Sequence, residues 1–290
     1  MRVLIVGATG MMGHVLFDVT RRQPDLDVYA TVRRGDERTL TFLRADTRRL
    51  FECDLTTSNQ IAPDLFCAPD VVVNCAGVVR HLHSLHPTVD LIKVDALAPH
   101  VLADYCNRRG ARLIQLSTDC VYSGRKGNYG EDDLPDQPDL HGRMKLLGEV
   151  SDAPHLTIRT SFIGHERFRE RGYFLLDWFL AQTGEVRGFT RARWSGLTTL
   201  ELARVIVALI QRPEVTGLLH VHGETISKYE LLCLAQSVFD KRDVVIRPDD
   251  DFQCDRSLRS LRLAALGIKV LGIRQMLVDL RGYYSRRETR

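Results

Sequence analysis

Apolar runs alternate with helical patterns through the first half of the chain. The runs that predict strands are Val3–Val6, Val28–Val32, Arg49–Cys53, Val71–Cys75 and Arg112–Leu116. Apolar residues at helical spacing over Met11–Arg22 and Thr88–Arg109 predict helices between them. Strands that are apolar throughout are typical of a parallel sheet covered on both faces. The alternation therefore predicts an α/β fold with a doubly wound parallel sheet.

The second half is less regular. It predicts strands at Leu156–Arg159, Leu218–Val221 and Val244–Ile246, and helices at Tyr173–Gln182, Leu200–Ile210, Lys228–Phe239, Leu258–Leu266 and Ile273–Tyr283. Insertions after the sixth strand would place a smaller lobe over the carboxyl ends of the strands, where open α/β sheets bind ligands. We expect a nucleotide-binding domain over 1–160 plus about 190–222, and a substrate-binding lobe over about 161–189 plus 223–290.

Composition places the chain among ordinary globular proteins. Its 290 residues are 44% hydrophobic and 27% charged, and the net charge of +3 gives no reason to expect a nucleic-acid partner. No apolar run approaches the roughly 18 residues of a membrane span, and Met1 leads directly into the first strand, so we expect a cytoplasmic protein. The seven cysteines form no C-x-x-C pair. They predict reduced thiols, with no metal site.

A glycine turn follows the first strand and opens the first helix. Its residues are Gly7, Ala8, Thr9, Gly10, Met11, Met12 and Gly13. Gly7 allows a tight turn, Gly10 lets a pyrophosphate approach the backbone, and Gly13 lets the helix pack on the strand. The free N–H groups of the helix N-terminus suit an anion. Together these features predict a Rossmann-type dinucleotide site.

The end of the second strand predicts which dinucleotide is bound. An acidic residue there would select NAD through the ribose hydroxyls. The chain has Arg33 and Arg34 instead, and two arginines can pair with a 2′-phosphate. We therefore expect NADP(H) in preference to NAD(H).

Three further features carry a family resemblance. The glycines follow the spacing G-x-x-G-x-x-G, a Ser117-Thr118-Asp119 segment ends the fifth strand, and Lys145 lies four residues after His141. Positions four apart share one face of a helix. The chain resembles the extended short-chain dehydrogenase/reductases and, over residues 117–161, the dTDP-4-dehydrorhamnose reductases within them.

The resemblance implies roles for individual residues. Thr118 would hydrogen-bond the keto or hydroxyl oxygen of the substrate, and Lys145 would hold the nicotinamide ribose. The segments after the third and fourth strands would line the nucleotide at Asp54, Leu55, Asn74, Cys75, Ala76 and Gly77. Candidates for substrate contact are Asp119, Tyr129, Arg159 and Arg256, with Arg191 and Arg193 as further candidates for its phosphates.

His141 departs from the family, which has a catalytic tyrosine at this position. The Lys145 cation would lower the pKa of His141 and leave neutral imidazole as the main form, which is a poor acid. Three interpretations stay open. His141 acts as a weaker proton donor, for instance through a water; Thr118, Tyr122 or Tyr129 orients the carbonyl or relays the proton; or the site binds NADP(H) without turnover.

Two functions follow from these alternatives. The first is an NADPH-dependent reductase of a nucleotide-diphospho-4-keto-6-deoxy sugar, with an epimerase or dehydratase as the alternative within the enzyme class. The second is a non-catalytic NADP(H)-binding regulatory protein, for which the regulatory beta subunit of methionine adenosyltransferase is a precedent. The expected partner is a nucleotide-sugar, and relatives often form homodimers.

Overall fold

The computed structural model describes residues 1–57, 67–166 and 174–288. Its main element is a seven-stranded sheet with the order β11-β6-β5-β4-β1-β2-β3, in which every neighbouring pair is parallel. The predicted doubly wound sheet is confirmed. The strands are β1 (Arg2–Val6), β2 (Asp27–Val32), β3 (Leu50–Glu52), β4 (Val71–Asn74), β5 (Arg112–Leu116), β6 (Leu156–Arg159) and β11 (Gly217–His220).

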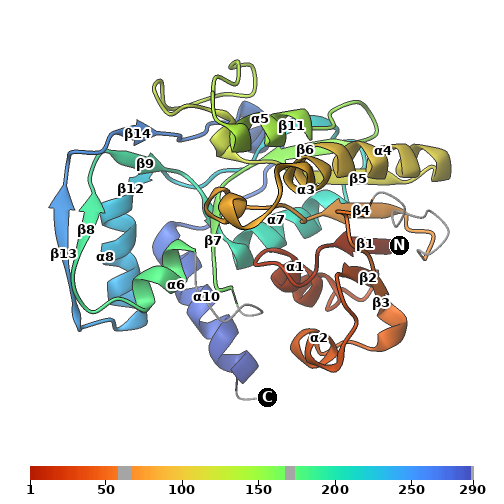
Figure 1. Ribbon diagram of the computed structural model, residues 1–290, viewed down its shortest axis with the longest axis horizontal. Coiled ribbons are helices and arrows are strands. Elements are labelled where there is room, and N and C mark those ends of the chain that lie inside the picture. Colours follow the sequence, from red (N-terminus) through yellow and green to blue (C-terminus); the bar gives the residue numbers. More distant parts are fainter. Residues whose placement is uncertain (58–66, 167–173, 289–290) are drawn as a thin grey trace.

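Helices cover both faces of this sheet (Figure 1). The helices of this part are α1 (Gly13–Thr20), α2 (Glu37–Leu43), α3 (Thr88–Ile92), α4 (Ala98–Arg109), α5 (Leu140–Leu147) and α7 (Thr199–Ile210). Val3 and Ile5 share a core with α1 and α7, whereas Leu4 and Val6 share a core with α4. Alternate side chains of one strand are thus buried on opposite faces, which explains the continuous apolar runs.

The predicted helix over Thr88–Arg109 is confirmed in extent but is interrupted. A π-helical turn, η4 (Lys93–Leu97), separates α3 from α4. Such turns insert an extra residue and re-phase the helix faces, and they are frequent at functional sites. Here the turn carries Asp95, whose side chain is fully buried.

A smaller group of elements lies beside the sheet, on the left in Figure 1. Its strands form small sheets: β8 (Gly184–Phe189) with β13 (Val244–Asp249); β12 (Ile226–Ser227), β9 (Ala192–Trp194) and β14 (Cys254–Asp255); and β7 (Phe162–Ile163) with β10 (Leu197–Thr198). Its helices are α6 (Leu175–Leu180) and α8 (Lys228–Phe239), whereas α9 (Leu261–Ala265) contacts β11 at the edge of the main sheet. The prediction for α6 began at Tyr173, which lies outside the described residues. The residue boundaries of the two domains stay a prediction.

The last helix, α10 (Ile273–Glu288), joins the two parts. It packs against both α7 and α8. Near its end, the Tyr284 hydroxyl lies 2.9 Å from Nε2 of His14, and the Tyr283 hydroxyl donates to the Asp18 carboxylate at 2.9 Å. His14 and Asp18 belong to α1, so α10 ties the smaller group to the first helix of the sheet. None of the described helices is long and apolar enough to span a membrane.

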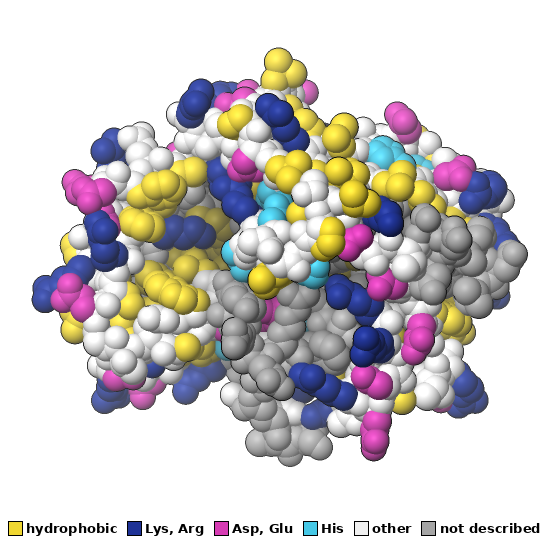
Figure 2. Space-filling view, viewed as in Figure 1, with side chains coloured by type: hydrophobic (Ala, Val, Ile, Leu, Met, Phe, Trp, Pro, Cys, Tyr) yellow, Lys and Arg dark blue, Asp and Glu magenta, His cyan; other side chains and the backbone are white. Residues whose placement is uncertain are grey.

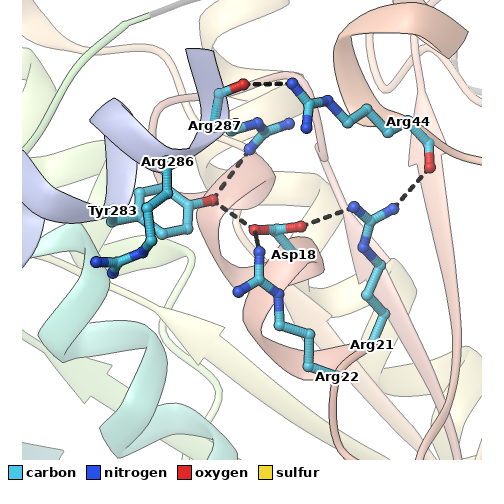
Figure 3. Close-up of a pocket in the computed structure, with 7 residues that line it drawn as sticks. All are labelled: Asp18, Arg21, Arg22, Arg44, Tyr283, Arg286 and Arg287. Atoms are coloured by element: carbon cyan, nitrogen blue, oxygen red, sulfur yellow. Dashed lines mark hydrogen bonds and ion pairs between the residues drawn. The ribbon is translucent and has the colours of Figure 1, made fainter. Parts of the chain in front are cut away.

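The ends of α1, α2 and α10 meet around a cavity of about 560 Å³ (Figure 3). Its lining residues are Asp18, Arg21, Arg22, Arg44, Tyr283, Arg286 and Arg287. Arg21 donates to the Leu43 carbonyl at 3.0 Å, and Arg287 donates to the Phe42 carbonyl at 2.7 Å. Arginines therefore bind the carbonyl ends of neighbouring helices, where positive charge is favourable. Burial raises the pKa of Asp18, but Arg21, Tyr283 and Arg22 outweigh burial and hold the pKa below its usual value.

Candidate active site

The glycine turn has the geometry that a pyrophosphate needs. Gly7 has φ +82°, in the left-handed region that favours glycine, and its N–H donates to Oγ1 of Thr31 at 3.1 Å. A Cβ at Gly13 would lie 2.1 Å from the Gly7 carbonyl oxygen, so only glycine fits there. Met12 provides no side-chain cap for α1 among the described residues. The first N–H groups of α1 therefore remain for an anion, and the turn fits a dinucleotide.

The predicted nucleotide residues of the second and third strands lie together. Arg33 and Arg34 follow β2 directly, and both are exposed. Asp54 accepts hydrogen bonds from the N–H and hydroxyl of Thr56, at 3.0 and 2.8 Å, and Leu55 beside it is buried. Burial raises the pKa of Asp54, but the Thr56 hydrogen bonds and the Arg33 cation outweigh burial and lower it. Arg33 is thus close enough to Asp54 for both to contact one nucleotide.

The segment after β4 connects the nucleotide side to the catalytic side. Asn74 is fully buried; its amide donates to Gln115 at 2.8 Å, and its oxygen accepts the Ala76 N–H at 3.1 Å. Cys75 follows it, and burial raises the pKa of its thiol to about 12. A Cβ at Gly77 would lie 3.7 Å from Nζ of Lys145. The predicted cofactor segment and the predicted catalytic lysine therefore meet.

Helix α5 presents His141 and Lys145 on its buried face. Asp139 caps the helix by accepting the Gly142 N–H at 2.8 Å. Nζ of Lys145 donates to the Leu116 carbonyl at 3.0 Å and lies 3.8 Å from the Asp95 carboxylate. Its ammonium is therefore held at the carboxyl end of β5.

Asp95 is a charged residue that the sequence did not point to. Both of its carboxylate oxygens lie 3.2 Å from the Val78 N–H, which donates to them. Burial raises the pKa of Asp95, and the Lys145 cation opposes this effect. Asp95 lies on the same buried side of the helix as Leu91 and Ala98, four residues before it and three after it.

Thr118 lies at the start of the turn η5 (Asp119–Val121). Its hydroxyl accepts the Cys120 N–H at 3.1 Å and donates to the Asp119 carboxylate at 3.2 Å. Helix α5 packs closely on this turn, because a Cβ at Gly142 would lie 2.6 Å from the Cys120 carbonyl oxygen. The structure therefore brings the segments of Thr118, His141 and Lys145 together.

His141 is only 8% exposed, and its pKa is lowered to about 3. Burial is the largest cause of the lowered pKa, followed by the charge of Lys145 and then by His83. The predicted neutral imidazole follows, although burial contributes more than the lysine that the sequence suggested. The His141 ring meets the His83 ring edge-on with centroids 5.2 Å apart, and its Nδ1 has no hydrogen-bond partner among the described residues.

Three of the predicted substrate or relay residues are buried and bonded to one another or to neighbouring residues. Arg159 is 4% exposed and donates two bonds to Glu149, both of 2.7 Å, and one to the Tyr122 hydroxyl at 2.6 Å. Tyr122 and Tyr129 are buried and stacked with ring centroids 4.1 Å apart. All three side chains are thus committed to buried partners, and the roles of Arg159 in phosphate binding and of a tyrosine as proton relay stay predictions. The sequence shows the types of these three residues, but it does not show that they are buried.

Further charged residues lie next to Thr118. Asp119 is buried, which raises its pKa, and the Arg256 and Lys228 cations oppose this effect. Arg256 donates from Nε to the Tyr122 carbonyl at 2.9 Å. Nζ of Lys228 lies 4.8 Å from the centre of the Trp194 ring, and burial lowers the pKa of Lys228 to about 8. Sequence reasoning missed Lys228, because it reads as an ordinary first residue of a helix.

Of the other two arginine candidates, Arg193 lies on β9 and Arg191 directly precedes this strand. Arg191 hydrogen-bonds Gln253, and Arg193 donates to the Thr225 carbonyl at 3.3 Å. Both hydrogen bonds are at the surface, so neither arginine is held by a buried partner. Figure 2 shows a hollow on this face of the molecule, around which Lys, Arg and His side chains gather.

The fold is that of the extended short-chain dehydrogenase/reductases. The chain belongs to the RmlD substrate binding domain family, whose model matches residues 1–259. Methionine adenosyltransferase 2 subunit beta from Bos taurus is 27% identical over 292 residues, which cover 94% of this chain and 83% of that protein. A dTDP-4-dehydrorhamnose reductase from Mycolicibacterium smegmatis is 30% identical over 150 residues, which cover 51% of this chain and 40% of that protein.

Solved structures agree on the fold. A hypothetical dTDP-4-dehydrorhamnose reductase from Sulfolobus tokodaii superposes with a TM-score of 0.74 and 25% identity, over 93% of this chain and 96% of that one. The dTDP-4-dehydrorhamnose reductase of Bacillus anthracis, solved with NADP, has a TM-score of 0.75 and 19% identity, over 96% of this chain and 98% of that one. A UDP-glucuronic acid 4-epimerase of Bacillus cereus, solved with NAD, has a TM-score of 0.75 and 16% identity, over 97% of this chain and 96% of that one.

Proposed function

We propose that the chain is a cytoplasmic NADPH-dependent reductase of a nucleotide-diphospho-4-keto-6-deoxy sugar. The observation that carries the proposal is the meeting of Thr118, His141 and Lys145 at the edge of the sheet where β4 and β5 end. Bound NADPH supplies the two electrons that reduce the ketone. The chain supplies the binding, the orientation and the proton.

Each group then has a task. The N–H groups that open α1 hold the pyrophosphate, and Arg33 with Arg34 pairs the 2′-phosphate. Lys145 holds the ribose hydroxyls of the nicotinamide half. Thr118 rotates its hydroxyl from Asp119 to the carbonyl oxygen of the sugar, and Asp119, Arg256 and Lys228 line the same side of the site.

A regulatory protein that binds NADP(H) without turnover is the second candidate. It is favoured by the low pKa of His141, which leaves a poor acid where the family has a tyrosine. It is also favoured by the similarity to the beta subunit of methionine adenosyltransferase 2. An epimerase or dehydratase is less consistent, because such relatives hold NAD tightly and the arginines after β2 suit a 2′-phosphate.

NADPH oxidation with a panel of keto-sugar nucleotides tests these candidates, for the wild type and for His141→Tyr. We expect turnover in both. Turnover only in the tyrosine variant would show that histidine does not serve as the donor and would favour the regulatory protein. Silence in both, with NADPH still bound, would reject a reductase for every sugar in the panel.

A further inference from the structure

The buried side of His141 adjoins two more titratable groups. One ring nitrogen of His83, one carboxylate oxygen of Asp95 and one ring nitrogen of His141 all lie within 4.8 Å of one another. His83 belongs to η3 (Arg80–Leu85) and is half-buried, whereas Asp95 is fully buried. Nε2 of His83 lies 3.3 Å from the Val78 carbonyl oxygen, and the partly exposed ring connects this cluster to solvent.

The spacing suits one bridging water. Two hydrogen bonds of about 2.9 Å that meet at a tetrahedral angle span about 4.7 Å. Buried waters typically bond two to four polar groups, and this cluster offers three. The buried Nδ1 of His141 needs a donor, because an unsatisfied buried polar atom costs about 1–3 kcal/mol.

We propose that His83, Asp95 and one bridging water form a proton path from solvent to Nδ1 of His141, so that His141 protonates the substrate oxygen without becoming imidazolium. The inference rests on the proposed reductase function and names positioning residues for it. It removes the objection to histidine as the donor. At a pKa of about 3, only about one His141 in ten thousand is protonated at pH 7.

The protons balance in this scheme. As the new C–H bond forms at the ketone carbon, the carbonyl oxygen takes the proton from Nε2 of His141 and becomes a hydroxyl. Nδ1 takes a proton from the water, the water takes one from His83, and His83 takes one from solvent. Asp95 stabilises the passing positive charge. After product release, Nε2 takes a solvent proton and Nδ1 returns its own, which restores the first tautomer.

The first test is His83→Ala. We expect kcat to fall roughly ten- to hundredfold, because general acid–base steps contribute on that scale or above. KM and the affinity for NADPH should stay within about twofold, and added imidazole should restore part of the rate, since His83 is half-exposed. His86→Ala, just beyond η3, is the matched control and should leave kcat unchanged. An undiminished kcat in His83→Ala would overturn the path.

A double variant separates the path from the proposed function. Tyrosine at 141 donates its own proton, so His83→Ala should slow the wild type but not His141→Tyr. If neither background turns over any keto-sugar, the reductase function fails. If the wild type turns over and His83→Ala slows both backgrounds equally, only the path fails. Loss of turnover with a chelator, restored by zinc, would assign the three groups to a metal and overturn the path.

A measurement without substrate completes the test. Imidazole ¹⁵N spectra of the protein report which nitrogen of His141 carries the proton. Removal of the donor by His83→Ala should shift the His141 tautomer resonances, whereas His86→Ala should not. Unchanged His141 resonances in His83→Ala would contradict contact through the water.

Discussion

Gly13→Ala is the sharpest test of the cofactor site. The added Cβ would lie 2.1 Å from the Gly7 carbonyl oxygen and 2.9 Å from Cα of Ala8. Cβ atoms in proteins essentially never approach other heavy atoms closer than 3.0 Å. Both neighbours are backbone atoms, so rotation of a side chain cannot relieve the clash. The start of α1 must therefore move away from the turn by about 1 Å.

That movement has a calculable effect on binding. Hydrogen bonds to a charged group contribute about 1.5–3 kcal/mol each, and they weaken steeply when stretched by about 1 Å. Loss of two bonds to the pyrophosphate would raise the Kd for NADPH by roughly a hundredfold or more, since 1.4 kcal/mol is a factor of ten. Overpacking also costs about 1–3 kcal/mol of stability. In a chain of 290 residues this lowers Tm by roughly 2–5 °C, because unfolding entropy is about 2.1 cal/mol/K per residue.

The assay is titration of NADPH fluorescence, with Tm measured on the same samples. Gly272→Ala is the matched control, because its Cβ would meet only the Glu224 carboxylate, at 3.9 Å. We expect wild-type affinity in the control. A Gly13→Ala protein that folds and binds NADPH as tightly as the wild type would refute the assignment of this turn to the pyrophosphate.

Three further predictions follow from charged groups. Replacing Arg33 and Arg34 together by alanine should weaken NADPH binding roughly ten- to hundredfold and leave NADH binding unchanged. An equal loss of affinity for NADPH and NADH would show that the arginines do not contact the 2′-phosphate. Asp18→Asn should cost about 1–3 kcal/mol in urea unfolding at pH 7. Because the folded pKa of Asp18 lies below its unfolded value, this difference should be present above about pH 4 and vanish as the pH falls through the folded pKa. The pKa of Lys228 near 8 predicts that the affinity of the wild type for a nucleotide-sugar falls as the pH rises past 8. Lys228→Met should bind the nucleotide-sugar weakly at every pH and should not show this fall. A pH profile of the variant that runs parallel to that of the wild type would refute the role of Lys228.

The sheet was predictable because its strands are buried on both faces. The runs Arg112–Leu116 and Leu156–Arg159 coincide with β5 and β6, and Lys228–Phe239 coincides with α8. The pairing of β8 with β13 was not predictable. Each has exposed residues within it, and their parallel register depends on tertiary contacts between segments about sixty residues apart. Only the end of β13 nearest Val244 has an apolar run.

The cofactor turn and Lys145 were predictable because their chemistry depends on local spacing. Asp95 was not, because Val94-Asp95-Ala96 reads as one polar position on an ordinary helix. Its burial and its contacts with Val78 and Lys145 depend on segments that are distant in the sequence. His83 and Lys228 were missed for a related reason. Their proximity to His141 and Asp119 depends on packing between segments distant in the sequence.

The polar cluster around His141 itself argues for catalysis over cofactor binding alone. Nδ1 of His141 has no protein hydrogen-bond partner among the described residues, so only an immobilised water can satisfy it, and a buried charge pair such as Lys145 with Asp95 is costly to desolvate. Binding of a pyrophosphate and an adenosine needs neither the buried imidazole nor the buried charge pair, and costly polar groups concentrate at functional sites. His141→Leu removes the imidazole and the need to immobilise a water, which costs up to about 2 kcal/mol. It should therefore raise Tm by up to about 3 °C, by the same entropy per residue, while abolishing turnover and keeping NADPH affinity. A leucine variant less stable than the wild type would show that the water-bonded imidazole stabilises the fold, and that the cluster is not held at a cost for chemistry.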